Sequence, residues 1–286
     1  MTRRLATLAA LAFLFGATAP SDAYDRCADI YGAASGQRLS LATGSPGELG
    51  LVKALVEAYN KVEPVSVCWK KAGSGASLKL LEAKAVDLIM VHAPAAEKKA
   101  VADGWAANRT LIGSNEFYLV GPPEDSAKIA EAKDAADAYR RIAQAQAKFF
   151  TRGDNSGTHM KELAIWGKAG VKPEGAWYVT SADFMAATLK RASDEGAYFM
   201  TDSSTWIAEG KNAPNLRILF RGDKFLVNTY HALSVPEGAT GGAAAAARFV
   251  RFLASEAGQG VIRDFGKDVH GRGIYDDAAY ASQYDD

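Results

Sequence analysis

Apolar positions in the first third of the chain follow two alternating spacings. Residues 37–43 (QRLSLAT) alternate polar and apolar positions as a strand does, and 48–60 carries apolar side chains at helical spacing. A strand at 65–69, a helix beginning near Leu78 and an apolar run at 87–91 (DLIMV) follow. This repetition of strand, loop and helix predicts a parallel sheet covered by helices.

The pattern resumes after a crossover marked by Pro122-Pro123. A short charged helix at 95–103 and a strand at 117–120 precede the crossover. Beyond it we predict a surface helix within 125–146, a strand ending at Phe150, helices from Thr158 and at 184–194, strands at 197–201, 216–221 and 225–235, and helices at 243–253 and 256–265. The acidic tail from Asp276 shows no such pattern, and we expect it to be loose.

Two such series predict an α/β protein with two lobes, each a mainly parallel sheet flanked by helices, and a ligand cleft between them. The late strand at 225–235 would return the chain to the first lobe. Ligands in such folds bind at loops beyond the carboxyl ends of strands. The candidate loops are 43–48, 73–77, 152–158 and 180–184.

The N-terminus has the pattern of an export signal. Two arginines precede an apolar run at 5–17, which is shorter than the ~20 residues needed to cross a bilayer. Small residues at Ser21 and Ala23 fit cleavage after Ala23, so we predict a signal peptide over 1–23. A short N-terminal anchor is the alternative. The rest of the chain has no apolar run of membrane-spanning length, and we expect an exported protein.

Charge and cysteine content narrow the chemistry further. The chain has 33 basic and 33 acidic residues, which argues against nucleic acid as a partner because such binding usually requires a basic face. A bound anion must therefore be held by local geometry rather than by an overall field. In an oxidising compartment, Cys27 and Cys68 indicate a disulfide between the new N-terminus and a strand, with two unpaired thiols as the alternative.

Residues 148–166 (KFFTRGDNSGTHMKELAIW) carry the clearest chemical signal. An apolar pair runs into Arg152, a polar loop containing Ser156 follows, and Thr158 opens a helical pattern. Such a junction directs hydroxyls, backbone N–H groups and the positive end of the helix dipole to one point. The guanidinium adds a planar, charged donor pair that fits an oxyanion. We predict an anion seat; the alternative is a surface ion pair between Arg152 and Asp154.

Two more loops, 43–48 and 73–77, have the same design. Each follows a predicted strand and precedes a helix. They supply the hydroxyls of Thr43, Ser45 and Ser74, and glycines that allow backbone N–H groups to approach a ligand. Turn formation and helix capping are the alternative explanation. Three such loops, one of them with an arginine, favour oxyanion binding.

Enzyme signatures are weak. The sequence contains neither a Gly-x-Ser-x-Gly nucleophile elbow nor a phosphate-binding P-loop. Its histidines, at positions 92, 159, 231 and 270, lack the spacing of a metal site. His92 follows the 87–91 strand, so one interpretation places it in the cleft as a catalytic residue; we favour the alternative, a structural hydrogen-bonding residue. We therefore predict no enzymatic activity, no cofactor and no direct metal ligands.

Several blocks, in the same order, resemble the periplasmic solute-binding proteins of the tungstate ABC transporter family. TRGDNSGTHMKELAIW is similar to the family's S-R-G-D-x-S-G-T-H-x-x-E-x-x-x-W, and VDLIMVHAPAAEKKAVADGW to its D-V-V-x-V-H-A-P block and the helix after it. NRTLIGSNEFYLVGPPED, AYFMTDSSTW and GDKFLVNTY are similar to further family segments. The resemblance covers nearly all of the chain after the predicted signal peptide.

The resemblance implies a type II periplasmic binding protein fold that closes on a tetrahedral oxyanion. In that fold, 24–121 would form the first part of lobe 1, 122–226 lobe 2, and 227–286 the return to lobe 1 with the C-terminal helices and tail. It also implies delivery of the oxyanion to a permease in the inner membrane, driven by a cytoplasmic ATPase.

By motif, Arg152 and Thr158 would be the central ligand contacts. Ser74 matches the hydroxyl position of the family's G-T-G turn, while Thr43 and Ser45 fall in its Thr-Thr-Thr-Ser loop. The predicted ligand-binding set is therefore Thr43, Ser45, Ser74, Arg152, Ser156 and Thr158.

Two loops depart from the family pattern. The 43–48 loop keeps only Thr-Gly-Ser-Pro-Gly and is shorter, so it has fewer hydroxyls. The family's Gly-Gln-Gly-Met turn is replaced by Ala-Asp-Phe-Met at 182–185. If Asp183 faced the cleft, its carboxylate would repel a divalent oxyanion. There are three alternatives: Asp183 points away from the cleft, the ligand is protonated, or the ligand has changed.

Three functions compete on this basis. The leading hypothesis is a monomeric periplasmic receptor for tungstate or the closely similar molybdate. The second keeps the fold but changes the cargo to phosphate, another oxyanion or a small carboxylate, as the altered loops indicate. The third is an exported sensor or adhesion module, for which the Arg-Gly-Asp tripeptide at 152–154 and the acidic tail are the only support.

Overall fold

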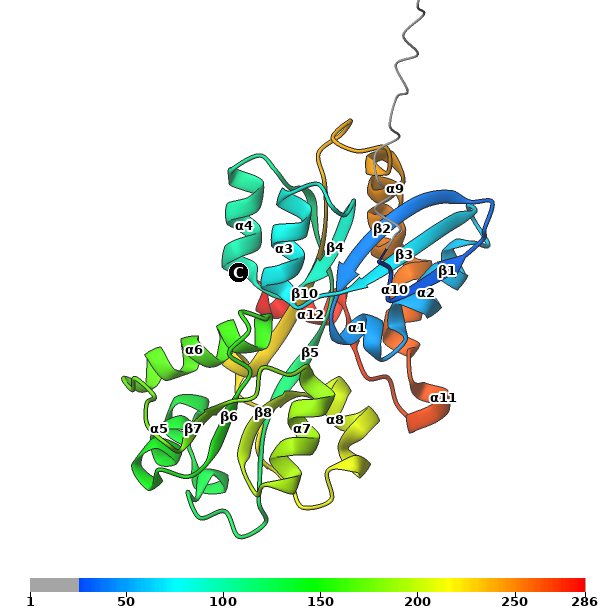
Figure 1. Ribbon diagram of the computed structural model, residues 1–286. Helices are drawn as coiled ribbons and strands as arrows, with labels where there is room; N and C mark the ends of the chain where they lie inside the picture. The colour runs from blue at the N-terminus through cyan, green and yellow to red at the C-terminus, as the bar shows by residue number, and fades with distance from the viewer. Residues whose placement is uncertain (1–25, 286) are drawn as a thin grey trace, which may run out of the picture.

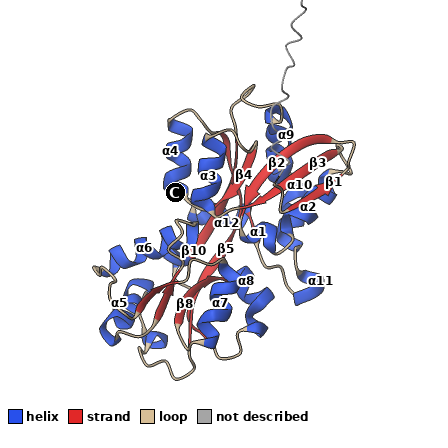
Figure 2. Ribbon diagram, in the orientation of Figure 1, coloured by secondary structure: helices blue, strands red, loops and turns tan. Residues whose placement is uncertain are grey.

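The computed structural model describes residues 26–285. Two lobes share one mixed sheet, and the strands β5 and β10 run from one lobe into the other (Figures 1 and 2). The strand order is β1-β3-β2-β4-β10-β5-β8-β6-β7, and β9 and β11 also pair with β5. The predicted signal peptide, 1–23, lies outside the described residues. Within 26–285, no helix has the length and apolar character required to cross a membrane.

The elements alternate along the chain as the sequence predicts. The strands are β1 (Asp29–Gly32), β2 (Gln37–Thr43), β3 (Val65–Lys71), β4 (Leu88–Val91), β5 (Ala107–Gly121), β6 (Phe149–Thr151), β7 (Tyr178–Thr180), β8 (Tyr198–Asp202), β9 (Arg217–Phe220), β10 (Val227–Ser234) and β11 (Asp276–Asp277). The helices are α1 (Ser45–Glu48), α2 (Leu51–Tyr59), α3 (Ser74–Glu82), α4 (Pro94–Ala102), α5 (Ala135–Ala145), α6 (Gly157–Ala169), α7 (Met185–Asp194), α8 (Ser203–Glu209), α9 (Ala243–Ala254), α10 (Glu256–Asp264), α11 (Lys267–His270) and α12 (Ala278–Ala281).

The predicted α/β class with two lobes is confirmed, but the sheet is mixed. At the centre of the first lobe, β2 runs parallel to β3 and β4, and at the centre of the second, β6 runs parallel to β7 and β8. Between these parallel groups, β10 and β5 pair antiparallel with each other and with their outer neighbours. The carboxyl ends of the two parallel groups therefore approach the crossing strands from both sides.

Strand β5 is much longer than the predicted 117–120. Its first part pairs with β10 and its last part with β8, so one strand belongs to both lobes. The sequence hides the first part because polar residues such as Asn108, Arg109 and Thr110 interrupt the apolar alternation. Hydrogen bonding to β10, rather than an apolar face, holds that part extended.

Neighbouring strand residues enter cores on opposite faces of the sheet. In the first lobe, Leu41 packs in the cluster with α2 and α9, whereas Ala42 packs with α3 and α4. In the second, Phe149 packs against α5 and α6 with Trp166, whereas Phe150 packs against α7. This is the two-residue period of a strand covered by helices on both faces.

Two predicted helices are shorter than expected. The helix predicted at 48–60 is divided into α1 and α2, because Gly50 takes the left-handed conformation at φ 93° between them. In the polar stretch 125–146, only α5 is an α-helix, and the Asp134 side chain caps it by accepting a hydrogen bond from Asp137 N at 2.6 Å.

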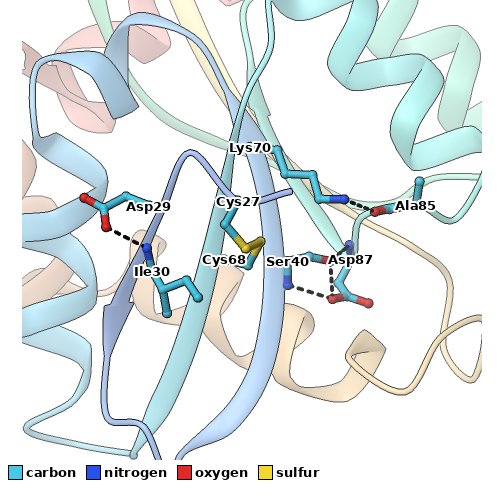
Figure 3. The surroundings of a disulfide bond; sticks show 8 residues. All are labelled: Cys27, Asp29, Ile30, Ser40, Cys68, Lys70, Ala85 and Asp87. Atoms are coloured by element: carbon cyan, nitrogen blue, oxygen red, sulfur yellow. Dashed lines mark hydrogen bonds between the residues drawn. A yellow bond between two sulfur atoms is a disulfide. The ribbon is translucent and has the colours of Figure 1, made fainter. Parts of the chain in front are cut away.

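A disulfide joins Cys27, just before β1, to Cys68 in β3, with 5.3 Å between the two Cα atoms (Figure 3). On the other side of β2, the buried Asp87 carboxylate accepts hydrogen bonds from Ser40 N and Ser40 Oγ at 2.8 and 2.7 Å. Both contacts hold neighbouring segments to the middle of β2 and β3, where Ser40 and Cys68 are paired.

The acidic tail is ordered, so the prediction of a loose tail is wrong. Asp276–Asp277 adds a short strand to β5, and the Asp277 side chain caps α12. Near the C-terminus, which lies beside α4 in Figure 1, Asp285 reaches His231 and Arg109. The tail is held by charged partners in the first lobe that are distant in sequence, which a local apolar pattern does not reveal.

Candidate functional site

A pocket lies between the lobes and brings together all six residues that the sequence singles out. It is small: the empty space between its lining atoms is about 310 Å³, a figure that includes open solvent. Its lining residues come from four loops, the end of β4 and the crossing strand β10: Thr43, Gly44, Ser45, Pro46, Gly73, Ser74, Met90, His92, Arg152, Ser156, Thr158, Phe184 and Tyr230. Whether the six predicted residues contact a ligand stays a prediction.

The second-lobe wall is the start of α6. The Ser156 side chain caps this helix by accepting a hydrogen bond from His159 N at 3.3 Å. Gly157 and Thr158 are the first helical residues, so their backbone N–H groups have no acceptor inside the helix. Thr158 is only 2 % exposed, and its hydroxyl finds no partner among residues 26–285. Unpaired donors and the helix dipole converge on the pocket.

Arg152 is buried at this wall, with 4 % of its surface exposed. Its Nε and Nη2 atoms lie 3.1 and 2.5 Å from the same oxygen of Asp154, Oδ2. Burial raises the pKa of Asp154, but the Arg152 charge and hydrogen bonds from Ser156 outweigh it, so the pKa lies below the usual value. The predicted ion pair therefore exists, between a buried guanidinium in the pocket wall and an exposed carboxylate.

The ion pair does not use all the donors of Arg152. No hydrogen bond from its Nη1 occurs within the described part of the chain, although the residue lines the pocket. Asp154 thus fixes the guanidinium plane and leaves part of its donor edge for a ligand. Within the Arg-Gly-Asp tripeptide, Gly153 and Asp154 are exposed, but the buried and paired Arg152 does not offer its guanidinium to an adhesion partner.

The first-lobe wall has hydroxyls that differ in what they offer. Ser74 Oγ accepts a hydrogen bond from His92 N at 3.2 Å, so its own proton is available to a ligand. Thr43 Oγ1 donates to Met90 O at 2.7 Å, so in this arrangement it presents lone pairs. Ser45 Oγ is 3.5 Å from Asp202 Oδ2 of the second lobe, a long contact that a ligand would readily replace.

The two walls touch directly. Gly75 N in the first lobe donates to Asn155 O in the second at 3.2 Å. A Cβ atom on Gly157 would come within 2.4 Å of the His92 ring, so only glycine allows the start of α6 to approach so closely. The lobes are therefore closed over the pocket.

The substituted loop 182–185 contributes an aromatic ring instead of a carboxylate. Asp183 is exposed and is not among the pocket residues, so it points away from the cleft. Phe184 lines the pocket in its place, with its ring centroid 5.4 Å from Arg152 Cζ and 4.2 Å from Lys71 Nζ. The ring covers the cations without adding negative charge.

A buried carboxyl group within α6 links this helix to β7. Glu162, one turn beyond Thr158, accepts hydrogen bonds from Tyr178 OH at 2.6 Å and Trp166 Nε1 at 3.1 Å. Burial raises the pKa of Glu162 to about 7. Near neutral pH this carboxyl group is therefore partly protonated, which limits the negative charge close to the anion seat.

Sequence reasoning missed three pocket residues and undervalued a fourth. Met90, Phe184 and Tyr230 are apolar or aromatic residues that read as core positions. His92 was interpreted as structural; it does hydrogen-bond Asn228, but its ring also lines the pocket. The position of His92 directly after a parallel strand was the available signal.

Comparisons with known proteins agree with this geometry. Residues 30–257 match the family described as PBP superfamily domain. The tungstate-binding protein TupA of Peptoclostridium acidaminophilum is 32% identical over 246 residues, covering 85% of this chain and 86% of that protein.

Two solved structures are also similar. The tungstate ABC transporter structure from Geobacter sulfurreducens is 38% identical, covers 80% of this chain and 98% of that chain, and has a TM-score of 0.72. The tungstate-binding protein TupA from Desulfovibrio alaskensis G20 is 35% identical, covers 84% and 98%, and has a TM-score of 0.68. The chain therefore belongs to the PBP superfamily and, within it, to the family of substrate-binding transport proteins that includes the tungstate-binding proteins.

Proposed function

We propose that this protein captures tungstate, or the closely similar molybdate, and delivers it to an ABC permease in the inner membrane. The observation that carries the proposal is the convergence of Arg152, Thr158 and Ser74 on one pocket with donors that no described residue uses. Oxyanion binding as the substrate-binding component of an ABC transporter follows from family membership; the identity of the metal oxyanion is the proposed part.

The pocket chemistry fits a tetrahedral dianion. Such an ion offers only acceptors, and the pocket supplies a fixed guanidinium, two hydroxyl donors and the N–H groups that begin α6. One cation and several neutral donors would replace the hydration shell without compensating the whole charge. Selectivity over the smaller sulfate would then rest on cavity size and donor placement.

The test of this proposal is calorimetry on Arg152→Ala with tungstate and molybdate. A charge-assisted hydrogen bond contributes roughly 1.5–3 kcal/mol, so affinity should fall about tenfold to a hundredfold or more. Arg152→Lys is the matched variant: it keeps the charge and loses the planar fork, and we expect a smaller loss. An Arg152→Ala protein that binds as tightly as the wild type would refute the assignment.

A second candidate keeps the fold and changes the anion to phosphate or a small carboxylate. The altered first-lobe loop favours it, because Thr43 spends its proton on Met90 O and leaves an acceptor in the pocket. An acceptor suits a ligand that carries its own proton. Titration of the wild type with tungstate, molybdate, sulfate and phosphate separates the two; no heat with either metal oxyanion would leave only this candidate.

The cellular setting is part of the proposal. We infer a periplasmic monomer without enzymatic activity, exported by a signal peptide at 1–23, with lobe 1 built from 24–121 and 227–286 and lobe 2 from 122–226. The disulfide between Cys27 and Cys68 fits an oxidising compartment. N-terminal sequencing of the protein from a periplasmic fraction tests this; a mature chain that starts at Met1 would contradict it.

A further inference from the structure

A chain of buried hydrogen bonds crosses the floor of the cleft from one lobe to the other. It starts at Asp202, where β8 ends in the second lobe, and Asn115 Nδ2 lies 3.3 Å from Asp202 Oδ1. Asn228 Nδ2 donates to Asn115 Oδ1 at 2.7 Å, and Asn228 Oδ1 lies 2.9 Å from His92 Nδ1 in the first lobe. The two asparagines sit on the crossing strands β5 and β10, so the chain spans the junction itself.

The direction of every bond in this chain is set by its first member. Asp202 is buried, and its two oxygens already accept hydrogen bonds from Thr205 N at 2.8 Å, from Thr205 Oγ1 at 2.9 Å and from Ser204 Oγ. Asn115 must therefore turn its NH₂ group toward Asp202 and its oxygen toward Asn228. Asn228 in turn directs NH₂ to Asn115 and its oxygen to His92. An amide oxygen only accepts, so the proton of a neutral His92 is on Nδ1.

This tautomer leaves His92 Nε2 as an acceptor. The ring is held between Tyr230 and Phe117, with centroid distances of 4.8 and 6.1 Å, and it lines the pocket. Nε2 has no hydrogen-bond partner within 26–285. An oxyanion seat thus contains a lone pair that would repel a ligand made only of acceptors, unless a proton lies between them.

Burial and the charged groups around the ring of His92 disfavour its protonated form. Burial lowers the pKa of His92 to about 4 from 6.5; the Asn228 hydrogen bond opposes this, Arg152 and Lys161 lower it further, and Asp154 raises it slightly. A bound dianion would offset the two cations and add an acceptor beside Nε2. Binding therefore reverses the balance that disfavours the imidazolium.

We propose that His92 is a proton-accepting contact of the anion site: binding of a fully deprotonated divalent oxyanion takes one proton from solvent onto Nε2, and the resulting N–H donates to a ligand oxygen. The proposal rests on the oxyanion-binding function above. A monohydrogen oxyanion would bring this proton itself and donate it to Nε2 without uptake. His92 would thereby link affinity for tungstate to pH and distinguish deprotonated from protonated anions.

Calorimetry of the wild type with sodium tungstate, in buffers that differ in ionisation enthalpy between pH 5.5 and 8, measures the proton uptake directly. We expect the uptake to approach one proton per bound tungstate at the acidic end. Between the pKa of His92 in the free protein and its higher pKa in the complex, the affinity should fall by up to about tenfold for each unit of pH. His92→Gln should bind with no such uptake or slope. His270→Gln, in the distant helix α11, is the matched control and should behave as the wild type.

The outcomes separate this inference from the proposed function. Tungstate binding without proton uptake overturns the role of His92 and leaves the transport function intact. Absence of binding to both tungstate and molybdate refutes the proposed cargo and the uptake together. ¹⁵N NMR of the free protein at pH 7 adds a test without ligand: the Nδ1–H tautomer of His92 is expected, and the Nε2–H tautomer would overturn the proposal even if the variant proteins fold poorly.

Discussion

Two histidines on adjacent strands of the first lobe have opposite surroundings. His92 follows β4 and faces an amide oxygen and the pocket, whereas His231 lies in β10, directly opposite Val91. The Nδ1 and Nε2 atoms of His231 are 3.0 Å from Glu97 and 3.1 Å from Asp285. The residue type is the same, and only the partners differ: the ring of His92 lines the pocket, whereas His231 is enclosed by two carboxylates and Arg109.

The cluster around His231 is closed on itself. Glu97 and His231 are fully buried, and Arg109 Nε donates to Glu97 Oε2 at 3.0 Å. Burial raises the pKa of Asp285, but its hydrogen bond to His231 and the charges of His231 and Arg109 outweigh this, so the pKa lies below the usual value. Arg109 and His231 face two carboxylates, and none of these groups lines the anion pocket. This cluster explains why the acidic tail is ordered.

The largest expected effect is on the free energy of unfolding, to which the cluster around His231 contributes independently of the anion pocket. Glu97→Ala leaves Arg109 and His231 buried without their shared carboxylate, which should cost roughly 3–5 kcal/mol in the free energy of unfolding. Urea denaturation measures this, and Glu97→Gln, which keeps the shape and the acceptor for Ala93 N, should lose less. Tungstate affinity at temperatures where the variant is folded should match the wild type. A loss of affinity would mean that the two sites are coupled.

The second prediction concerns acid. The folded state lowers the pKa of His92 to about 4, so below pH 6.5 the unfolded chain binds this proton more readily. Stability should therefore fall as the pH drops from about 6.5 to about 4, by on the order of 3 kcal/mol from this residue. Thermal unfolding of wild type and His92→Gln across this range isolates the contribution as the difference between the two slopes. Parallel slopes would show that His92 is not held neutral.

The smallest effect lies at the tail. Asp285 is partly accessible, so Asp285→Ala should cost about 1 kcal/mol at neutral pH. Because its pKa is lowered in the folded state, this contribution is present above the ordinary carboxyl pKa and disappears as the pH falls, so the variant and the wild type should converge in acid. Asp268→Ala, at an exposed position in α11, is the control and should have little effect. Equal losses of stability in both variants would mean that Asp285 does not contribute to the cluster around His231.

The loop at 152–158 could be predicted because the signals that form it are local in the sequence. A strand ending at Thr151, a cap at Ser156 and a helix from Gly157 follow from residues within a few positions of one another. The first half of β5 could not be predicted, because its polar residues are held by pairing with β10. The tail could not be predicted either, since the partners of Asp285 lie at positions 109 and 231, which no pattern along the chain brings together with it.

Sequence alone determined the α/β alternation, the three polar loops after strands, and the identity of the six residues that now line one pocket. Those features depend on local periodicity and on loop chemistry. The tertiary structure alone decided the donor or acceptor character of the groups in that pocket: Thr43 gives its proton to Met90 O, Asp183 turns outward, and a chain of amides from Asp202 sets the tautomer of His92. Proton positions depend on partners that folding brings from distant parts of the chain, and no local pattern in the sequence reveals those partners.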